Sequence, residues 1–189
     1  MLNALYNDYR EKFKGFEIVV GEGNLSPKVL LIGEAPGKDE VRLGRPFVGA
    51  AGKNLNKFLE ILRLSREEVF ITNAIKYRLS KVNPKTSRLL NRPALASEIE
   101  SNRDYLYREI QILKPIVIVT LGNVPLKAVL SDMSVQIGAM HGKLVTVDVL
   151  GDEYNLFPLY HPASVIYNRD LKEVYLKDLE ALREVSTPD

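Results

Sequence analysis

Four side chains that could do chemistry follow the ends of predicted strands. Glu34 and Phe47 lie in a loop rich in glycine and proline that comes directly after an apolar run. Asn73 ends a second apolar run, and His161 follows the last one. The carboxyl ends of parallel strands share one edge of a sheet, and open α/β sheets bind their ligands there. We therefore expect these side chains to meet in a single crevice.

Their residue types suit a pocket for a flat, polar molecule. The Phe47 ring offers a face for stacking, and the Glu34 carboxylate places an acid beside it. The Asn73 amide has one acceptor and two donors, which can recognise the edge of a nucleobase. A neutral His161 imidazole can donate to a carbonyl oxygen that gains charge as a base departs. Taken singly, Asn73 equally suits a turn and His161 a structural role, so the prediction depends on their convergence.

The sequence of this loop can also be compared with the P-loop motif. Gly52-Lys53 matches the end of that motif, but the motif needs Ser or Thr where Asn54 stands and Gly where Phe47 stands. The sequence therefore excludes a nucleotide-triphosphate P-loop. Backbone N–H groups at the start of the following helix remain suited to an electron-rich edge. A tight turn without any ligand is the alternative.

Composition bounds the class of protein. The chain has 189 residues, of which 46% are hydrophobic, enough for one domain over residues 1–189. The net charge of +2 does not decide whether the partner is a polyanion. The strongest local bias is segment 76–92, which has no Asp or Glu and contains Lys76, Arg78, Lys81, Lys85, Arg88 and Arg92. Such a segment can bind phosphates, although a solvated face is the more common explanation.

The chain has no cysteine and only two histidines, His141 and His161. Disulfides, thiolate zinc sites, a cysteine nucleophile and a cysteine-ligated iron–sulfur cluster are therefore excluded. His141 is interpreted as a loop residue. No stretch has the length and apolarity of a membrane span, and the N-terminus does not have the pattern of a signal peptide. We expect a cytoplasmic protein without membrane contact.

Apolar runs alternate with helical patterns along the chain. Strands are predicted at 29–32, 69–73, 116–121 and 155–160, with an outer strand at 144–149. Helical spacing follows the glycine loop and recurs at 94–113, 124–130 and 171–185. Residues 78–93 are interpreted as a long loop. This order favours an α/β fold with a mainly parallel sheet between two layers of helices.

Four motifs in one order resemble those of the family-4 uracil-DNA glycosylases. They are Gly33-Glu34-Ala35-Pro36-Gly37, the segment 44–52, the segment 71–76, and His161-Pro162-Ala163. The resemblance covers residues 17 to 170 approximately. It implies a three-layer α/β/α fold with a central, four-stranded, mainly parallel sheet. It also implies that the protein hydrolyses the N-glycosidic bond of deoxyuridine in DNA, for base excision repair.

The resemblance also implies roles for individual residues. Phe47 would stack on the flipped uracil and Asn73 would bind its O4/N3 edge, while His161 would bind O2 and stabilise the departing uracil anion. Glu34 would place or polarise the attacking water. The backbone of Ala35 and the side chain of Glu40 would complete the pocket. The base preference stays open, because Val41 stands where the family often has an acidic residue.

The DNA backbone would be bound by the basic segment, through Lys76, Arg78, Lys81 and Lys85. Residues 164–167 would form a loop that enters the minor groove, with Ser164 among its DNA contacts and Val165 or Ile166 as an apolar wedge. The partner is then DNA that contains uracil, bound by a monomer.

The family carries four cysteines that ligate an iron–sulfur cluster, and this chain has none. The corresponding positions fall near Tyr6, Tyr9, Tyr77 and Asn102, which we expect to fill the volume with rings and hydrogen bonds. No cofactor is expected. Two alternatives stay open: a catalytically silent protein that binds DNA or a nucleobase on the same fold, and a glycosylase for another deaminated base.

Overall fold

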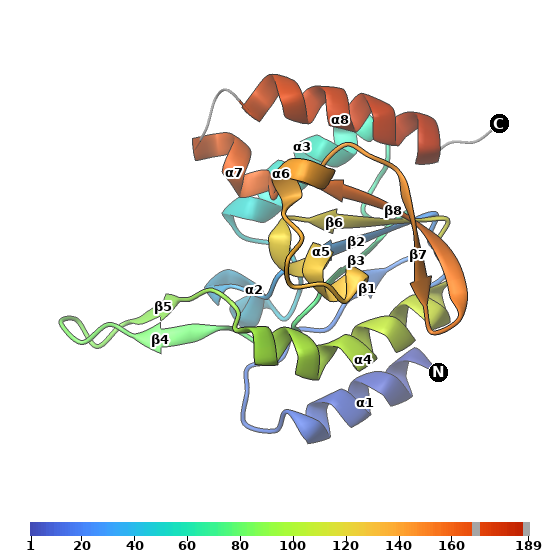
Figure 1. Ribbon diagram of the computed structural model, residues 1–189. Coiled ribbons are helices and arrows are strands. Elements are labelled where there is room, and N and C mark those ends of the chain that lie inside the picture. The colour runs from blue at the N-terminus through green and yellow to red at the C-terminus, as the bar shows by residue number, and fades with distance from the viewer. Residues whose placement is uncertain (168–170, 187–189) are drawn as a thin grey trace.

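A six-stranded sheet forms the middle layer of the protein (Figure 1). The computed structural model describes residues 1–167 and 171–186, apart from the side chains of residues 165–167. The strand order is β1-β3-β2-β6-β8-β7. In that order the strands are Glu22–Gly23, Phe70–Asn73, Val29–Gly33, Val117–Leu121, Asp152–Leu159 and Val145–Val149. The four inner strands are parallel and the two edge strands antiparallel, which confirms the predicted mainly parallel sheet.

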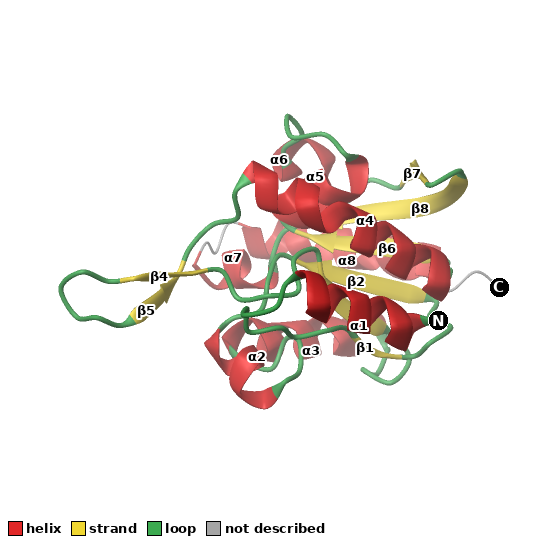
Figure 2. Cartoon of the chain, turned by 90° about the horizontal axis from the view of Figure 1, so that it is seen from below, coloured by secondary structure: helices red, strands yellow, loops and turns green. Residues whose placement is uncertain are grey.

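Helices cover both faces of this sheet, as Figures 1 and 2 show. One face carries α1 (Leu2–Lys12), α4 (Ala96–Leu113) and α5 (Asn123–Leu130). The other carries α3 (Ala50–Leu62) and α8 (Leu171–Ser186). Three shorter helices complete the fold of the described residues: α2 (Lys38–Leu43), α6 (Ile137–Met140) and α7 (Pro162–Tyr167).

The pattern of β2 explains why both faces are covered. Leu30 and Ile32 pack into the core beneath α1 and α4, while Val29 and Leu31 pack into the core beneath α3 and α8. A parallel strand buried on both faces is a continuous apolar run rather than an alternating one. No helix among residues 1–167 and 171–186 is both long and apolar enough to cross a membrane.

Two predicted loops are wrong. Residues 78–93 contain a β-hairpin, β4 (Ser80–Val82) paired with β5 (Leu89–Asn91), which projects from the body of the protein (Figures 1 and 2). Its turn closes through hydrogen bonds at Asn83, whose N–H donates to Arg88 O at 2.8 Å. The segment after His161 is helix α7 rather than a loop, because Pro162 suits the first helical position and Ser164 N–H bonds His161 O at 2.8 Å.

The region of the expected cluster cysteines is packed with aromatic rings. Tyr9 donates to Asn102 Oδ1, and Asn102 Nδ2 lies 3.5 Å from Tyr77 Oη. Tyr9 also packs against Phe13 and Tyr105, with ring centroids 4.5 and 5.0 Å apart. These side chains bond one another and offer no thiolate, so the residues present do not fit the family's iron–sulfur cluster. Within the described chain, no three His, Cys, Asp or Glu side chains gather as metal ligands.

Candidate active site

A cavity of about 340 Å³ opens at the carboxyl ends of β2, β3 and β8. This volume suits a small-molecule or nucleobase ligand. Its walls bring together residues that are far apart in the chain, among them Glu34, Ala35, Glu40, Phe47, Asn73, Asn91 and His161. The four side chains singled out in the sequence therefore line one cavity, as their positions at strand ends predict.

Gly33 allows two of these side chains to meet. It pairs with Asn73 in the register of β2 and β3. A Cβ at Gly33 would lie 2.5 Å from Asn73 Oδ1 and 2.5 Å from Phe47 Cζ, which is far too close. Only glycine lets the amide and the ring converge at this strand end.

The Asn73 amide is available to a ligand. The residue is buried, and among the described residues no hydrogen-bond partner is found for its side chain. Its amide borders the cavity, where a bound ligand with matching polar groups can supply the missing hydrogen bonds. Its backbone is held firmly, since Ala74 N–H donates to Gly33 O at 2.8 Å and Ile75 N–H to Glu34 O at 3.0 Å.

Phe47 has a left-handed backbone, with φ at +52°. This conformation costs a residue with a side chain about 1–2 kcal/mol, so contacts elsewhere must hold it. The conformation places the ring beside His161, with centroids 6.1 Å apart and planes inclined by 29°. The two rings therefore form part of the wall of the same cavity.

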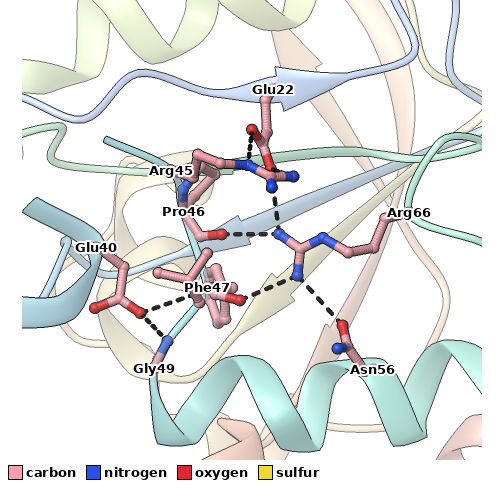
Figure 3. Close-up of polar contacts among 9 residues, drawn as sticks. Glu22, Glu40, Arg45, Pro46, Phe47, Gly49, Asn56 and Arg66 are labelled. Atoms are coloured by element: carbon pink, nitrogen blue, oxygen red, sulfur yellow. Dashed lines mark hydrogen bonds and ion pairs between the residues drawn. The ribbon is translucent and has the colours of Figure 1, made fainter. Parts of the chain in front are cut away.

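Two side chains hold the Phe47 loop from opposite ends (Figure 3). The Glu40 carboxylate accepts the N–H groups of Gly37, Val48 and Gly49 at 3.1, 3.0 and 2.8 Å. Glu40 lines the cavity as predicted from the resemblance, but both of its oxygens are occupied by the backbone of the loop. Its contribution here is to shape the loop.

Arg66 is the second of these side chains and was not predicted from the sequence. Its Nη2 donates to Pro46 O at 2.8 Å and its Nη1 to Phe47 O at 3.0 Å (Figure 3). Glu22 accepts Arg66 Nη2 at 3.4 Å and also Arg45, at 2.9 and 3.0 Å. No local motif marks Arg66, because its partners are brought to it only by the folded chain.

Glu34 combines burial with one fixed hydrogen bond. Ala94 N–H donates to its Oε1 at 3.2 Å. Burial raises the pKa of this carboxyl, and the bond from Ala94 opposes part of that rise. Among the described residues Oε2 has no partner, so the ionised carboxylate can accept a hydrogen bond from a water molecule in the cavity.

His161 is held as a hydrogen-bond donor. Ala163 N–H donates to its Nδ1 at 3.2 Å, so we assign the proton of the neutral ring to Nε2. Burial lowers the pKa of the imidazole, which keeps it neutral near pH 7. The ring therefore presents an N–H group without a positive charge.

The predicted role of Lys76 in DNA binding is wrong. Its side chain is 1% exposed and forms an ion pair with Glu109, itself fully buried, at 2.9 Å. Its Nζ also donates to Asn73 O at 3.1 Å. A charge that is buried and paired cannot reach a phosphate, so Lys76 stabilises the core behind Asn73 instead.

Arg78 has a similar correction. Its side chain is mostly buried and lies 3.8 Å from Glu17, and its Nε donates to Asn91 Oδ1 at 3.3 Å. This bond turns the Asn91 amide so that Nδ2 faces Gly37 and the cavity. Asn91 was missed in the sequence because only the hairpin register places it there.

The remaining predicted DNA contacts lie on two segments. Lys81 and Lys85 are exposed on the β4–β5 hairpin. Ser164 is half-buried at the start of α7. Val165 and Ile166 belong to the same helix, but their side chains are outside the described part of the structure.

Comparisons with known proteins agree with this geometry. Residues 20–183 match the family model of the uracil DNA glycosylase superfamily. The chain is 39% identical to a type-4 uracil-DNA glycosylase of Saccharolobus solfataricus, over 88% of this chain and 74% of that protein. It is 36% identical to the type-4 enzyme of Archaeoglobus fulgidus (88% and 81% covered) and 34% identical to that of Thermotoga maritima (86% and 80%).

These relatives cover most of the chain, and the matched region includes every strand and every residue of the cavity. The chain belongs to the uracil-DNA glycosylase superfamily and, within it, to the type-4 uracil-DNA glycosylases.

Proposed function

We propose that the protein is a monofunctional uracil-DNA glycosylase. It flips uracil out of DNA and hydrolyses the bond between C1′ and N1, which leaves an abasic site for base excision repair. The single observation that supports this most strongly is the meeting of Phe47, Asn73 and His161 in one cavity beside Glu34. The names of the type-4 relatives support the same reaction.

Recognition of uracil follows from the chemistry of the cavity wall. Phe47 stacks on the base, and the Asn73 amide accepts from N3–H and donates to O4. Cytosine has an acceptor at N3 and a donor at C4, so an amide in the orientation that binds uracil faces the N3 acceptor with its oxygen and the amino group with its own N–H groups. A buried polar group left unpaired in this way gives strong discrimination.

Departure of the base depends on His161. When the C1′–N1 bond breaks, its electron pair goes to the uracil ring and negative charge gathers on O2. The Nε2–H group donates to this oxygen. Because the imidazole is neutral, it stabilises the charge on O2 through a hydrogen bond and keeps its proton. A donor aimed at developing charge in a water-poor site is typically worth about 10²–10³ in rate.

Glu34 serves the other side of the reaction. A water oxygen forms the new bond to C1′ while a proton leaves that water, and the carboxylate orients the water by accepting its hydrogen bond. The product is an abasic deoxyribose with a hydroxyl at C1′, and the uracil anion takes up a proton. Burial of Glu34 makes its ionised form a stronger acceptor than a carboxylate in bulk water.

The test is excision from duplex and single-stranded DNA that carries one uracil, with abasic sites revealed by alkaline cleavage. Matched substrates carry hypoxanthine, xanthine or thymine in its place. We expect product from uracil. Binding of uracil-DNA without cleavage would instead favour a silent binding protein, and product from another base alone would favour a different substrate.

We also propose that residues 1–189 form one domain that acts as a monomer in the cytoplasm and needs no iron–sulfur cluster. The aromatic packing around Tyr9 and Asn102, at the positions that correspond to the family's ligands, supports a fold that is stable without the cluster. Sedimentation and iron analysis of the purified protein test these points. A dimer, or stoichiometric iron with absorbance in the visible range, would contradict them.

A further inference from the structure

The β4–β5 hairpin carries an exposed apolar strip that the reaction does not use. Val82 is 61% exposed and Leu89 is 50% exposed. The two residues pair directly across the hairpin, so they lie on the same face. Exposed aliphatic side chains gathered on a projecting element favour contact with a partner.

This strip is continuous with the cavity. Ser80 pairs with Asn91, and both lie on the same face as Val82 and Leu89 because side chains alternate along a strand. Asn91 lines the cavity, and its amide is turned toward it by Arg78. One face of the hairpin therefore runs outward from the cavity wall.

The hairpin also carries unpaired positive charge. Lys81, Lys85 and Arg88 are exposed, and segment 76–92 contains no acidic residue. Among the described residues, none of these three side chains has an ion pair. Lys85 and Arg88 stand at the turn, beyond the apolar strip. Aliphatic side chains followed by free cations match the bases or sugars of a nucleic acid followed by its phosphates.

We propose that this face of the hairpin binds the DNA beside the flipped nucleotide. Val82 and Leu89 contact sugars or exposed base edges, and Lys85 and Arg88 bind phosphates farther along. A strand of three residues is about 10 Å long, which equals about three base pairs of duplex. The inference rests on the proposed function, because it assumes that a flipped base occupies the cavity.

The experiment compares faces of the same hairpin. Binding is measured by anisotropy, with a labelled duplex that carries a tetrahydrofuran abasic analogue and cannot be cleaved. Val82→Ala/Leu89→Ala is expected to weaken binding about tenfold, because two apolar contacts are truncated. Leu90→Ala is the matched control, since Leu90 pairs with Lys81 on the opposite face and is 43% exposed.

A second pair of variants tests the charges. Lys85→Ala/Arg88→Ala is expected to reduce the slope of log affinity against log salt by about 2, one unit for each lost phosphate contact. Lys28→Ala/Lys114→Gly is the control, because both exposed lysines come before the amino ends of the inner strands β2 and β6, whereas the cavity lies at the carboxyl ends, and glycine suits the left-handed φ of Lys114.

Shortened duplexes locate the contact. Trimming one flank to about two base pairs should weaken binding by the native protein more than binding by the Val82→Ala/Leu89→Ala variant, because that variant has already lost the apolar contact and loses only the phosphate contacts of Lys85 and Arg88. Equal binding by all variants, a larger effect of Leu90→Ala, or a change in oligomeric state without a change in DNA binding would overturn the inference. If the variants bind DNA as tightly as the native protein and the native protein excises uracil, only this inference is overturned. If the variants bind more weakly but the native protein excises no uracil, only the proposed function is overturned.

Discussion

Arg66 should control catalysis although it lies outside the cavity. The Arg66→Ala substitution removes two hydrogen bonds to the loop, to Pro46 O at 2.8 Å and to Phe47 O at 3.0 Å, besides the longer bonds to Asn56 and Glu22 at 3.3 and 3.4 Å. Bonds from a charged donor contribute about 1.5–3 kcal/mol each, and water replaces part of this at a half-buried site. We therefore expect the unfolding free energy to fall by about 2 kcal/mol.

The same loss affects the conformation of Phe47. Its φ of +52° stores about 1–2 kcal/mol of strain, which the bonds from Arg66 offset. Once Arg66 is gone the loop relaxes and the ring leaves its stacking position. If the stacking conformation of the loop loses about 2 kcal/mol relative to the relaxed conformation, the fraction of molecules with Phe47 in its stacking position falls by up to about 30-fold, and kcat/KM falls with it.

Single-turnover excision, with enzyme in excess over the DNA but well below saturation, measures kcat/KM, and circular dichroism confirms that the variant is folded. Arg45→Ala is the control, because Arg45 bonds Glu22 but neither loop carbonyl and its side chain is 59% exposed. The control should change stability by less than about 0.5 kcal/mol and leave the rate intact. A folded Arg66→Ala variant whose kcat/KM stays within about twofold of the native value would refute this reasoning.

Three further outcomes are expected. Burial raises the pKa of Glu34, so the folded protein favours the protonated carboxyl and loses stability as the pH rises through the raised pKa. The Glu34→Gln variant, whose side chain stays neutral, should therefore have a higher Tm than the native protein at neutral pH, an equal Tm in acid, and a low rate of excision. An unchanged Tm at neutral pH would count against this reasoning. Excision needs ionised Glu34 and neutral His161, and burial lowers the pKa of His161. The excision rate measured from about pH 4 to 9 should therefore fall only on the acid side, and a decline on the alkaline side would contradict these roles. Lys76→Met should cost about 3–5 kcal/mol in urea unfolding, because it leaves Glu109 buried without its cation, and should not change the salt dependence of DNA binding.

The parallel sheet was predictable because its strands are buried on both faces. Runs such as Val29–Gly33 and Val117–Leu121 are continuous and apolar, and Gly or Pro bounds them. Strand ends then determine which loops meet, so Asn73 and His161 could be placed together without knowledge of any contact. The edge strand β1 was not predicted, because two residues are too few to show the alternation of apolar and polar side chains by which a strand is recognised.

The hairpin and helix α7 were missed for a related reason. Strands of three residues, Ser80–Val82 and Leu89–Asn91, are too short to show a period within a basic segment, and their pairing depends on the turn at Asn83. The six residues of α7 begin at Pro162, which is also typical of a turn. Short elements are specified by a few hydrogen bonds rather than by hydrophobic spacing.

Electrostatic partners were the least predictable part of the site. Composition placed Lys76 in a basic segment, but its carboxylate partner Glu109 lies 33 residues away on α4. Arg66 likewise bonds carbonyls that are 19 and 20 residues distant. Such pairs depend on the folded backbone, so a sequence shows the charges without their partners.

The most direct test of the catalytic site is the single-turnover rate of uracil excision by the native protein, measured beside the Asn73→Ala and His161→Ala variants at saturating enzyme. We predict rapid formation of abasic sites by the native protein and a rate lower by about 10²–10³ for each variant. No abasic product from the native protein, or equal rates for all three proteins, would contradict the assignment of this cavity as the catalytic site.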